Sequence, residues 1–266
     1  MSSNQEEIIV RHIFARDILP KLLSICGTVC RDGQKLPTVT SGFAWDYKDE
    51  LLFITAGHCI KKLNSYKKQY GEDNVKLFLG DGYSSSDSPM LSFPLPMDQD
   101  RIIVVDTETK DKADFAIIRL PKLMQQALRD NGVVPFNREE NASVPHWKDF
   151  DIFYLFGFPR KSSFCEDDII SHEPTCIPLG FKEIDSSGRF KGKITSRKES
   201  SDFVKGMSGG PIVGIKNYEN SHKKWVMAIQ SSQVNSGLYV YATTVDTVIE
   251  FLEQNPEEFA RIIAPY

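Results

Sequence analysis

Apolar positions along the chain fall mainly into short runs separated by turn-rich pieces, a pattern typical of β-strands rather than of long helices. Six such runs occupy the first half, at about 25–30, 39–45, 51–56, 75–79, 101–105 and 114–120. Six more occupy the second half, at about 151–157, 174–180, 189–196, 210–215, 224–230 and 237–243. Because six short antiparallel strands suffice for one small barrel, the pattern predicts an all-β chain with two six-stranded antiparallel β-barrels.

Three stretches depart from this pattern. Residues 5–24 mix isoleucine and leucine with charges and fit one helix, or two interrupted at Pro20, either packed outside the barrel or serving as a docking arm. Residues 60–71 are rich in lysine and tyrosine, which indicates a polar turn or short helix. Val245, Val248, Ile249 and Leu252 form one apolar stripe of a helix. The predicted organisation is a helical extension at 1–24, a first barrel at 25–121, a connection at 122–150, a second barrel at 151–244 and a C-terminal helix at 245–266.

Composition and charge narrow the possible partners. The chain has 266 residues, of which 41% are hydrophobic, and a net charge of −4 that is spread along the sequence. It has no basic stretch typical of nucleic-acid or anionic-lipid binding and no apolar run long enough to span a membrane. The polar, acidic start of the chain does not resemble a secretory signal. We therefore expect a protein or peptide partner, and neither nucleic acid nor a membrane.

The cysteines suggest a reducing compartment. Their number is odd, five, and their spacing forms no compact disulfide framework, which favours free thiols and a cytoplasmic location. Cys59 is expected to be a small buried hydrophobic residue. Cys165, His172 and Cys176 could be read as metal ligands, but their spacing matches no closed four-ligand pattern. We expect neither a metal nor another cofactor.

A glycine-rich turn at 205–211 carries the strongest chemical signal, with Ser208 at its centre and an apolar run after it. Glycines on both sides of the serine allow a ligand carbonyl to approach main-chain N–H groups, as an oxyanion hole requires. A serine is a poor nucleophile without a base and an orienting carboxylate. His58 ends one buried-looking strand and Asp114 opens another, so both groups have candidates upstream.

These pieces, in the order His, Asp, Ser, resemble the trypsin/chymotrypsin-like serine peptidases of intracellular or bacterial type. Residues 226–233 resemble the family's strand beside the bound peptide, 236–240 resemble the next strand, and 156–159 resemble a Gly-aromatic-Pro turn. The resemblance covers about residues 25–252. It implies a serine endopeptidase that forms an acyl-enzyme in a cleft between two barrels, with His58 and Asp114 from the first and Ser208 from the second.

The resemblance also implies further site residues. The N–H groups of Gly206 and Ser208 would bind the oxyanion. Asp202, six positions before the nucleophile, would favour Arg or Lys in the substrate, or it is a solvated loop residue. Met207 stands where zymogen-activated relatives have an aspartate, so the turn is either always ordered or ordered by substrate or a regulatory partner. The substrate-binding candidates are Asp202, Ser231, Ser232, Gln233 and Gly237.

Two alternatives stay open. One is a binding module that keeps the fold but is catalytically silent or needs activation by a partner. The other is an enzyme dedicated to one protein, for which generic peptides would be poor substrates.

Overall fold

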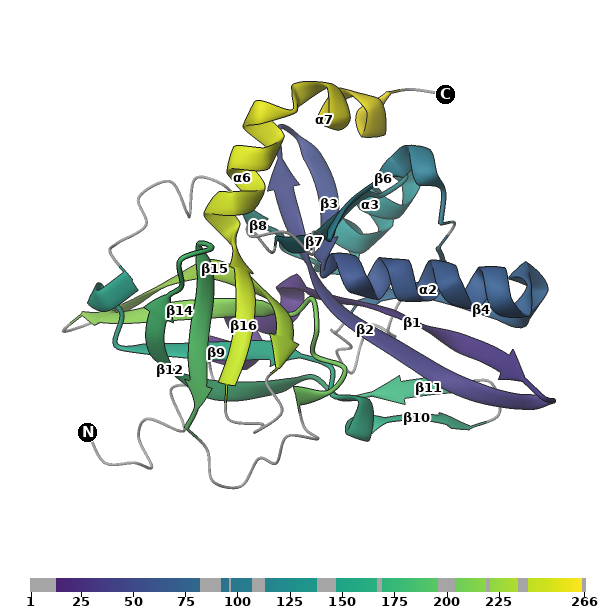
Figure 1. The fold of residues 1–266 in the computed structure, drawn as a ribbon, viewed down its shortest axis with the longest axis horizontal. Coiled ribbons are helices and arrows are strands. Elements are labelled where there is room, and N and C mark those ends of the chain that lie inside the picture. The colour runs from purple at the N-terminus through teal and green to yellow at the C-terminus, as the bar shows by residue number, and fades with distance from the viewer. Residues whose placement is uncertain are drawn as a thin grey trace.

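A computed structural model gives the fold of most of the chain (Figure 1). Its strands confirm the all-β prediction, and helices lie between and after them. The structure describes residues 13–81, 92–95, 97–106, 113–137, 147–166, 169–195, 204–218, 221–233 and 239–264.

The second half of the chain forms the closed barrel that the sequence predicts. Six strands pair antiparallel in the closed order β12-β13-β16-β15-β14-β9. Their inward-facing apolar side chains fill the barrel around Phe153, Phe190 and Met227. The strands are β9 (Ile152–Gly157), β12 (Thr175–Ile184), β13 (Arg189–Ile194), β14 (Pro211–Tyr218), β15 (Ser221–Gln233) and β16 (Tyr239–Thr244).

The first half forms an eight-stranded sheet in the order β5-β4-β1-β2-β3-β7-β6, with β8 added in parallel to β2. In the described part of the chain its end strands, β5 and β6, do not pair with each other, so the closure predicted for this half is not formed there. The short strand β5 occupies the outer edge of β4, which closure would need. The strands are β1 (Leu22–Arg31), β2 (Gln34–Tyr47), β3 (Glu50–Thr55), β4 (Val75–Asp81), β5 (Ser92–Pro94), β6 (Ile102–Asp106), β7 (Asp114–Arg119) and β8 (Phe136–Asn137).

In its described part the N-terminal segment agrees with two short helices interrupted at Pro20, but it ends at Lys21, before the expected residue 24. A π-helical turn, η1 (Phe14–Ile18), and a 3-10 turn, η2 (Leu19–Lys21), are followed directly by β1 at Leu22. Pro20 cannot donate a backbone hydrogen bond, and Leu22 already pairs with Phe43 of β2. Ile13 and Ile18 are buried in the core, which agrees with a segment packed on the outside of the sheet.

Two helices differ from the prediction: the one after β3 is longer, and the C-terminal one is interrupted. The polar stretch after β3 is a full α-helix, α2 (Gly57–Tyr70). The C-terminal helix divides at Asn255 and Pro256 into α6 (Val245–Gln254) and α7 (Pro256–Ile263). No described helix is long and apolar enough to cross a membrane. The remaining elements are α3 (Lys122–Asp130), the hairpin β10 (Ser163–Glu166) and β11 (Ile169–His172), and the 3-10 turns η3 (Glu72–Asn74), η4 (Gln99–Arg101), η5 (Trp147–Asp149) and η6 (Arg160–Ser162).

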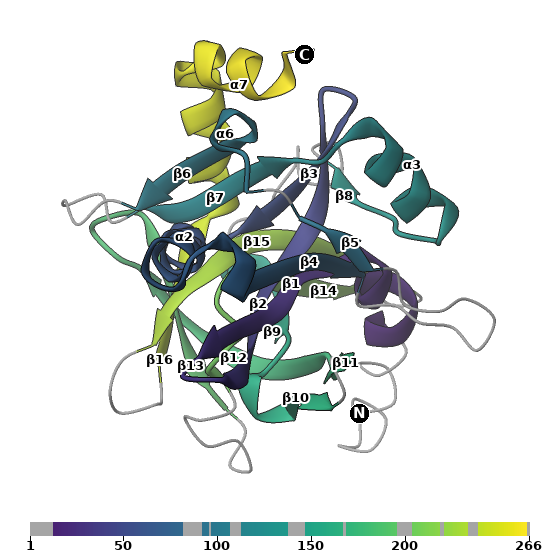
Figure 2. The same ribbon diagram turned by 90° about the vertical axis from the view of Figure 1, so that its right-hand side faces the viewer.

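One apolar cluster joins the two halves, because it contains Phe43 and Phe115 from the first sheet together with Phe156 from the barrel. Helix α6 leaves the barrel after β16 and runs to the first sheet, where α7 lies beside β6 and β7 (Figures 1 and 2). The Phe251 ring of α6 packs edge-on against Phe115 at 5.4 Å between centroids. The packing holds the first sheet directly against the barrel.

Candidate active site

His58 lies in the first turn of α2, immediately after β3. The helix starts at Gly57, where a Cβ atom would come within 2.8 Å of the Phe115 carbonyl oxygen. Because only glycine permits this close approach, the N-terminus of α2 lies directly against β7. The His58 backbone N–H thereby reaches Asp114 Oδ1 at 2.9 Å.

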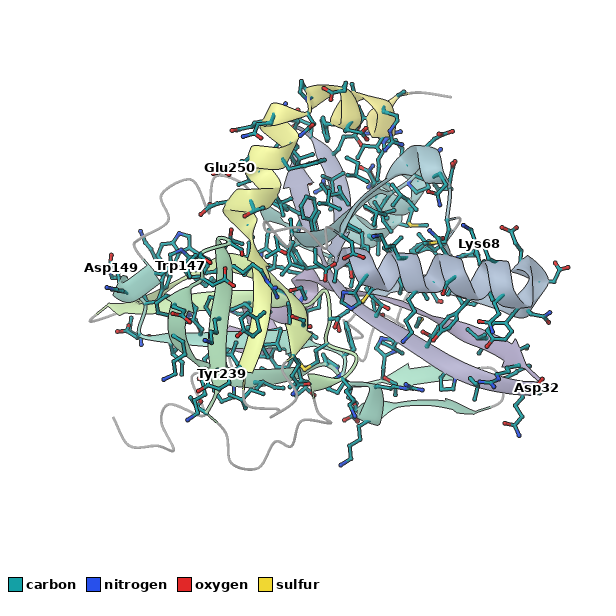
Figure 3. All side chains as sticks on the ribbon, viewed as in Figure 1. Asp32, Lys68, Trp147, Asp149, Tyr239 and Glu250 are labelled. Carbon is teal, nitrogen blue, oxygen red and sulfur yellow. The ribbon has the colours of Figure 1, made fainter. Side chains whose placement is uncertain are left out.

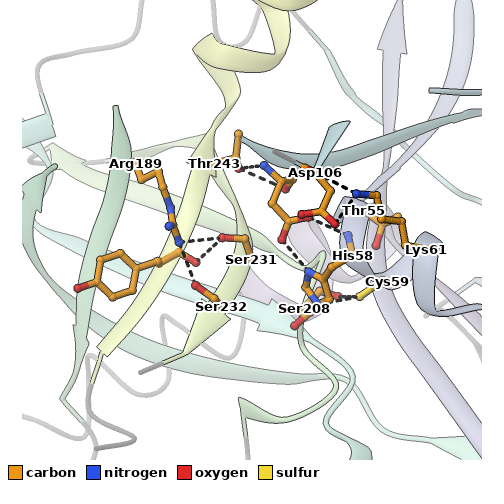
Figure 4. Close-up of polar contacts among 12 residues, drawn as sticks. Thr55, His58, Cys59, Lys61, Asp106, Arg189, Ser208, Ser231, Ser232 and Thr243 are labelled. Carbon is orange, nitrogen blue, oxygen red and sulfur yellow. Dashed lines mark hydrogen bonds and ion pairs between the residues drawn. The ribbon is translucent and has the colours of Figure 1, made fainter. Parts of the chain in front are cut away.

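The Asp114 carboxylate also accepts a hydrogen bond from the ring of the same histidine. His58 Nδ1 lies 2.6 Å from Asp114 Oδ2, so the carboxylate contacts both the backbone and the imidazole of one residue. Thr243 of the barrel accepts a hydrogen bond from the Asp114 N–H at 2.9 Å and donates one to the Asp114 carbonyl at 3.2 Å. The aspartate is therefore fixed from both halves, and it leaves Nε2 as the ring nitrogen that faces away from the carboxylate (Figure 4).

Ser208 occupies a tight turn before β14, at residues 204–210, which we call the serine turn. Gly206 and Gly209 have φ values of 96° and 91°, which disfavour any residue with a side chain. Internal hydrogen bonds hold the turn: the Met207 N–H donates to the Val204 carbonyl and the Gly210 N–H to the Met207 carbonyl. The Gly209 N–H donates to the Gln230 carbonyl at 2.7 Å, which fixes the turn to β15.

The peptide between Lys205 and Gly206 is fixed on its carbonyl side. The Lys205 carbonyl accepts a hydrogen bond of 2.7 Å from the Arg160 N–H. In a trans peptide the N–H points away from the C=O, so the Gly206 N–H faces away from Arg160. On the other side, the buried Ser41 hydroxyl of β2 donates to the Gly206 carbonyl at 2.9 Å and accepts from the Phe158 N–H at 2.8 Å.

Ser41 is a residue of the site that sequence reasoning missed. Its only sequence signal is a small polar residue in a strand that also contains Thr38 and Thr40, a pattern that many strands share.

Nothing in the described residues hydrogen-bonds the Ser208 hydroxyl to His58. Cys59 Sγ lies instead 3.4 Å from His58 Nε2 and 3.8 Å from the Ser208 carbonyl oxygen (Figure 4). Cys59 is buried, as predicted, but it also contacts the candidate base. Burial disfavours the charged ring, yet the hydrogen bonds to Asp114 and Cys59 outweigh it and raise the pKa of His58 to about 10.

The substrate-binding candidates lie partly within the described residues. Ser231 and Ser232 are in β15, and both hydroxyls accept hydrogen bonds from Arg189 of β13, at 3.3 and 2.9 Å. The Arg189 guanidinium also lies over the Tyr241 ring, 4.9 Å from its centroid. Gln233 ends β15. Asp202 and Gly237 lie outside the described residues. Arg189 therefore occupies the hydroxyls that we expected to face substrate, and no sequence signal indicated it.

The described residues contain no group of three or more His, Cys, Asp or Glu side chains placed to hold a metal ion. The Cys165 side chain lies outside them.

Comparison with known proteins gives structural likeness only. No protein-family model matches the chain, and no curated protein matches it. Among solved structures, the chain is similar to the protease Anisep from Arthrobacter nicotinovorans, at 14% identity and a TM-score of 0.46, over 85% of this chain and 90% of that one. It is also similar to the thermostable serine protease AL20 from an extremophilic microorganism, at 10% identity and a TM-score of 0.49, over 92% of this chain and 99% of that one.

Proposed function

We propose that the protein is a serine endopeptidase that hydrolyses peptide bonds through His58, Asp114 and Ser208. The observation that carries the proposal is the double contact of one carboxylate with His58, at 2.6 Å to the ring and 2.9 Å to the backbone. That contact orients the imidazole and supports its positive charge during the reaction. The adjoining serine turn supplies a nucleophile and an N–H group directed away from Arg160.

In the proposed reaction the Ser208 hydroxyl oxygen attacks the scissile carbonyl carbon while His58 Nε2 takes its proton. The N–H groups of Gly206 and Ser208 bind the oxyanion, and each such donor typically contributes about 2.7–4 kcal/mol. The protonated histidine then gives its proton to the leaving amine, which leaves an acyl-enzyme. Water attacks this ester with His58 again as base, which releases the acid and restores Ser208.

The resting geometry requires one adjustment before this chemistry. His58 Nε2 has to exchange its contact with Cys59 for one with the Ser208 hydroxyl while the ring keeps its hydrogen bond to Asp114. Catalytic hydrogen bonds are often loose in proteins without substrate, so the missing contact does not favour a silent binding module. The raised pKa of His58 implies that the base becomes available only as the pH rises.

The candidate residue for primary specificity, Asp202, lies outside the described residues. We keep Asp202 as the candidate that would favour Arg or Lys, and Asp202→Asn should then abolish cleavage after these residues. Unchanged preference in the variant would remove Asp202 from the site.

The proposal is tested first by intact mass after treatment with a fluorophosphonate, which reports an activated serine. We expect a single adduct on the wild type and none on Ser208→Ala or His58→Ala. A folded wild-type protein without an adduct would overturn the proposal. Because activated esters can be hydrolysed without peptidase activity, the second measurement is cleavage of a proteome-derived peptide library, with Ser208→Ala as the matched control. New peptide ends with the wild type alone are the expected result.

A further inference from the structure

A cleft of about 540 Å³ opens beside the candidate nucleophile. It begins at Gly206 and Ser208 and extends between the β1–β2 hairpin and α2, which run alongside each other (Figure 1). Its walls combine apolar side chains with cationic ones. The lining residues are Val29, Arg31, Leu36, Pro37, Thr38, Val39, Lys62, Tyr66, Tyr70, Arg160, Lys205, Gly206 and Ser208.

The charged residues that the structure describes along this cleft have one sign. Arg31, Lys62, Arg160 and Lys205 line it, and all four are exposed, whereas no aspartate or glutamate is among the described lining residues. They come from β1, α2, η6 and the serine turn, so the fold brings them together from separate elements. The whole chain has a net charge of −4, so this cluster opposes the overall sign of the protein.

Two of the four lining cations are less suitable for a test, because Lys205 belongs to the serine turn itself and Arg31 has an acidic neighbour. Arg31 is 3.4 Å from Asp32 at the tip of the β1–β2 hairpin, so its positive charge is partly compensated (Figure 3). Lys61, next to Lys62 on α2, is paired with Asp106 at 2.9 Å and does not line the cleft. Lys62 and Arg160 are therefore the natural residues to test, and Lys61 is a matched control.

The position of the cleft indicates which part of a substrate it would hold. In the proposed reaction we place the acyl part of the peptide along β15, at residues 231–233, because this segment resembles the serine peptidases' strand beside the bound peptide. None of these residues lines the cleft, which extends from Ser208 toward β2 and α2. The cleft is thus on the side of the amine that leaves.

We propose that this cleft binds the leaving-group side of peptide substrates and selects Asp or Glu side chains there, an inference that rests on the proposed function. Exposed carboxylates of an extended peptide would lie near Lys62 and Arg160, and apolar side chains would contact Leu36, Tyr66 and Tyr70. Because all the cations are exposed, the attraction decreases as salt is added.

Acyl transfer measures this selection without knowledge of the primary specificity. The enzyme is acetylated with 4-nitrophenyl acetate, which releases nitrophenol and leaves an ester on Ser208. An added peptide amine, Ala-Glu-Glu-amide or Ala-Gln-Gln-amide, then attacks the ester carbonyl in competition with water. The peptide becomes N-acetylated, and Ser208 leaves as the alcohol with its proton returned through His58. Mass spectrometry gives the ratio of the two acetylated peptides.

We expect the glutamate peptide to be acetylated about tenfold more than the glutamine peptide at 20 mM salt, with the preference falling at 500 mM. Lys62→Gln and Arg160→Gln should each reduce the preference about two- to fivefold, as exposed ion pairs do. Lys61→Gln should leave it unchanged. An acetyl-enzyme that transfers equally to both peptides, or an equal loss in Lys61→Gln, would overturn the inference while the proposed function stands.

Failure of the proposed function would be recognised separately, because no acetyl-enzyme or fluorophosphonate adduct would form. The cleft is then tested by fluorescence anisotropy of the same two peptides, carrying one dye, on the Ser208→Ala variant. Tighter binding of the glutamate peptide that is lost in Lys62→Gln would support the cleft, and equal binding would overturn it.

Discussion

Replacing Ser41 by alanine is the most informative single change, because its hydroxyl connects β2 of the first sheet to Gly206 in the serine turn of the second half. The substitution removes the 2.9 Å bond to the Gly206 carbonyl and the 2.8 Å bond from the Phe158 N–H. Phe158 is fully buried, so its N–H is left without a partner away from water. Two lost hydrogen bonds and the desolvation of the abandoned groups amount to about 2–4 kcal/mol. For a chain of this size, that lowers the Tm by roughly 4–16 °C.

The same change should reduce reactivity at temperatures where the variant is fully folded. Without Ser41 the Gly206 carbonyl loses its donor, and the turn around Gly206 keeps the bonds from Arg160 to the Lys205 carbonyl and from Met207 to the Val204 carbonyl, so the proposed oxyanion donor is held less firmly. Complete loss of one such donor costs about 10²–10³ in kcat, so we expect labelling by a fluorophosphonate to slow about tenfold to a hundredfold. The assay is the second-order labelling rate measured by intact mass, together with the Tm.

Ser24→Ala is the matched control for this prediction. Ser24 is an equally buried serine on β1, directly opposite Ser41, but its hydroxyl contacts His172 Nε2 at 3.0 Å rather than the turn. Its variant should lose about 1 kcal/mol of stability and keep the wild-type labelling rate. The reasoning would be refuted if Ser41→Ala were destabilised yet labelled at the wild-type rate, because Ser41 would then be structural only.

Three further predictions concern the same site. Asp114→Asn should lower kcat about 10⁴-fold, because His58 loses its orienting acceptor; steady-state kinetics that find near-wild-type turnover would contradict the role. Cys59→Ala removes one cause that raises the pKa of His58, so the low-pH limb of kcat/KM should move to lower pH, and an unmoved limb between pH 5 and 10.5 would contradict it. Gly209→Ala forces a side chain onto a φ of 91° and against the Thr55 hydroxyl, so urea unfolding should show a loss of about 2–6 kcal/mol; wild-type stability would argue against the tight turn.

The strands were predictable where burial dominates the sequence. β3 and β7 are nearly continuous apolar runs, and the pattern places both within two residues of their observed bounds. The hairpin β10–β11 and the two-residue β8 were not predicted, because their pairing depends on partners rather than on their own residues. Helix α2 was underestimated, since its charged outer face conceals the few positions that pack against the sheet.

The candidate site likewise contains residues that the sequence indicates and residues that it does not. Candidates for the nucleophile, base and acid could be named from the sequence, because glycine-rich turns and strand ends leave a local signature around each, and their catalytic roles stay predictions. Ser41 and Arg189 could not be named, because their roles arise from contacts across the fold. Ser41 lies 165 positions from Gly206, and Arg189 lies 43 positions from Ser232. No local pattern distinguishes either residue from an ordinary strand position.

Each half of the molecule holds a candidate reactive group of the other half in place. Asp114 belongs to the first sheet, but its backbone is fixed by Thr243 of the barrel. Gly206 precedes a barrel strand, but its carbonyl is held by Ser41 of the first sheet. These hydrogen bonds are buried or partly buried, and their partners would be left unsatisfied if the halves separated. Any change that loosens the packing between the halves should therefore disturb both the position of His58 and the serine turn, before either half unfolds.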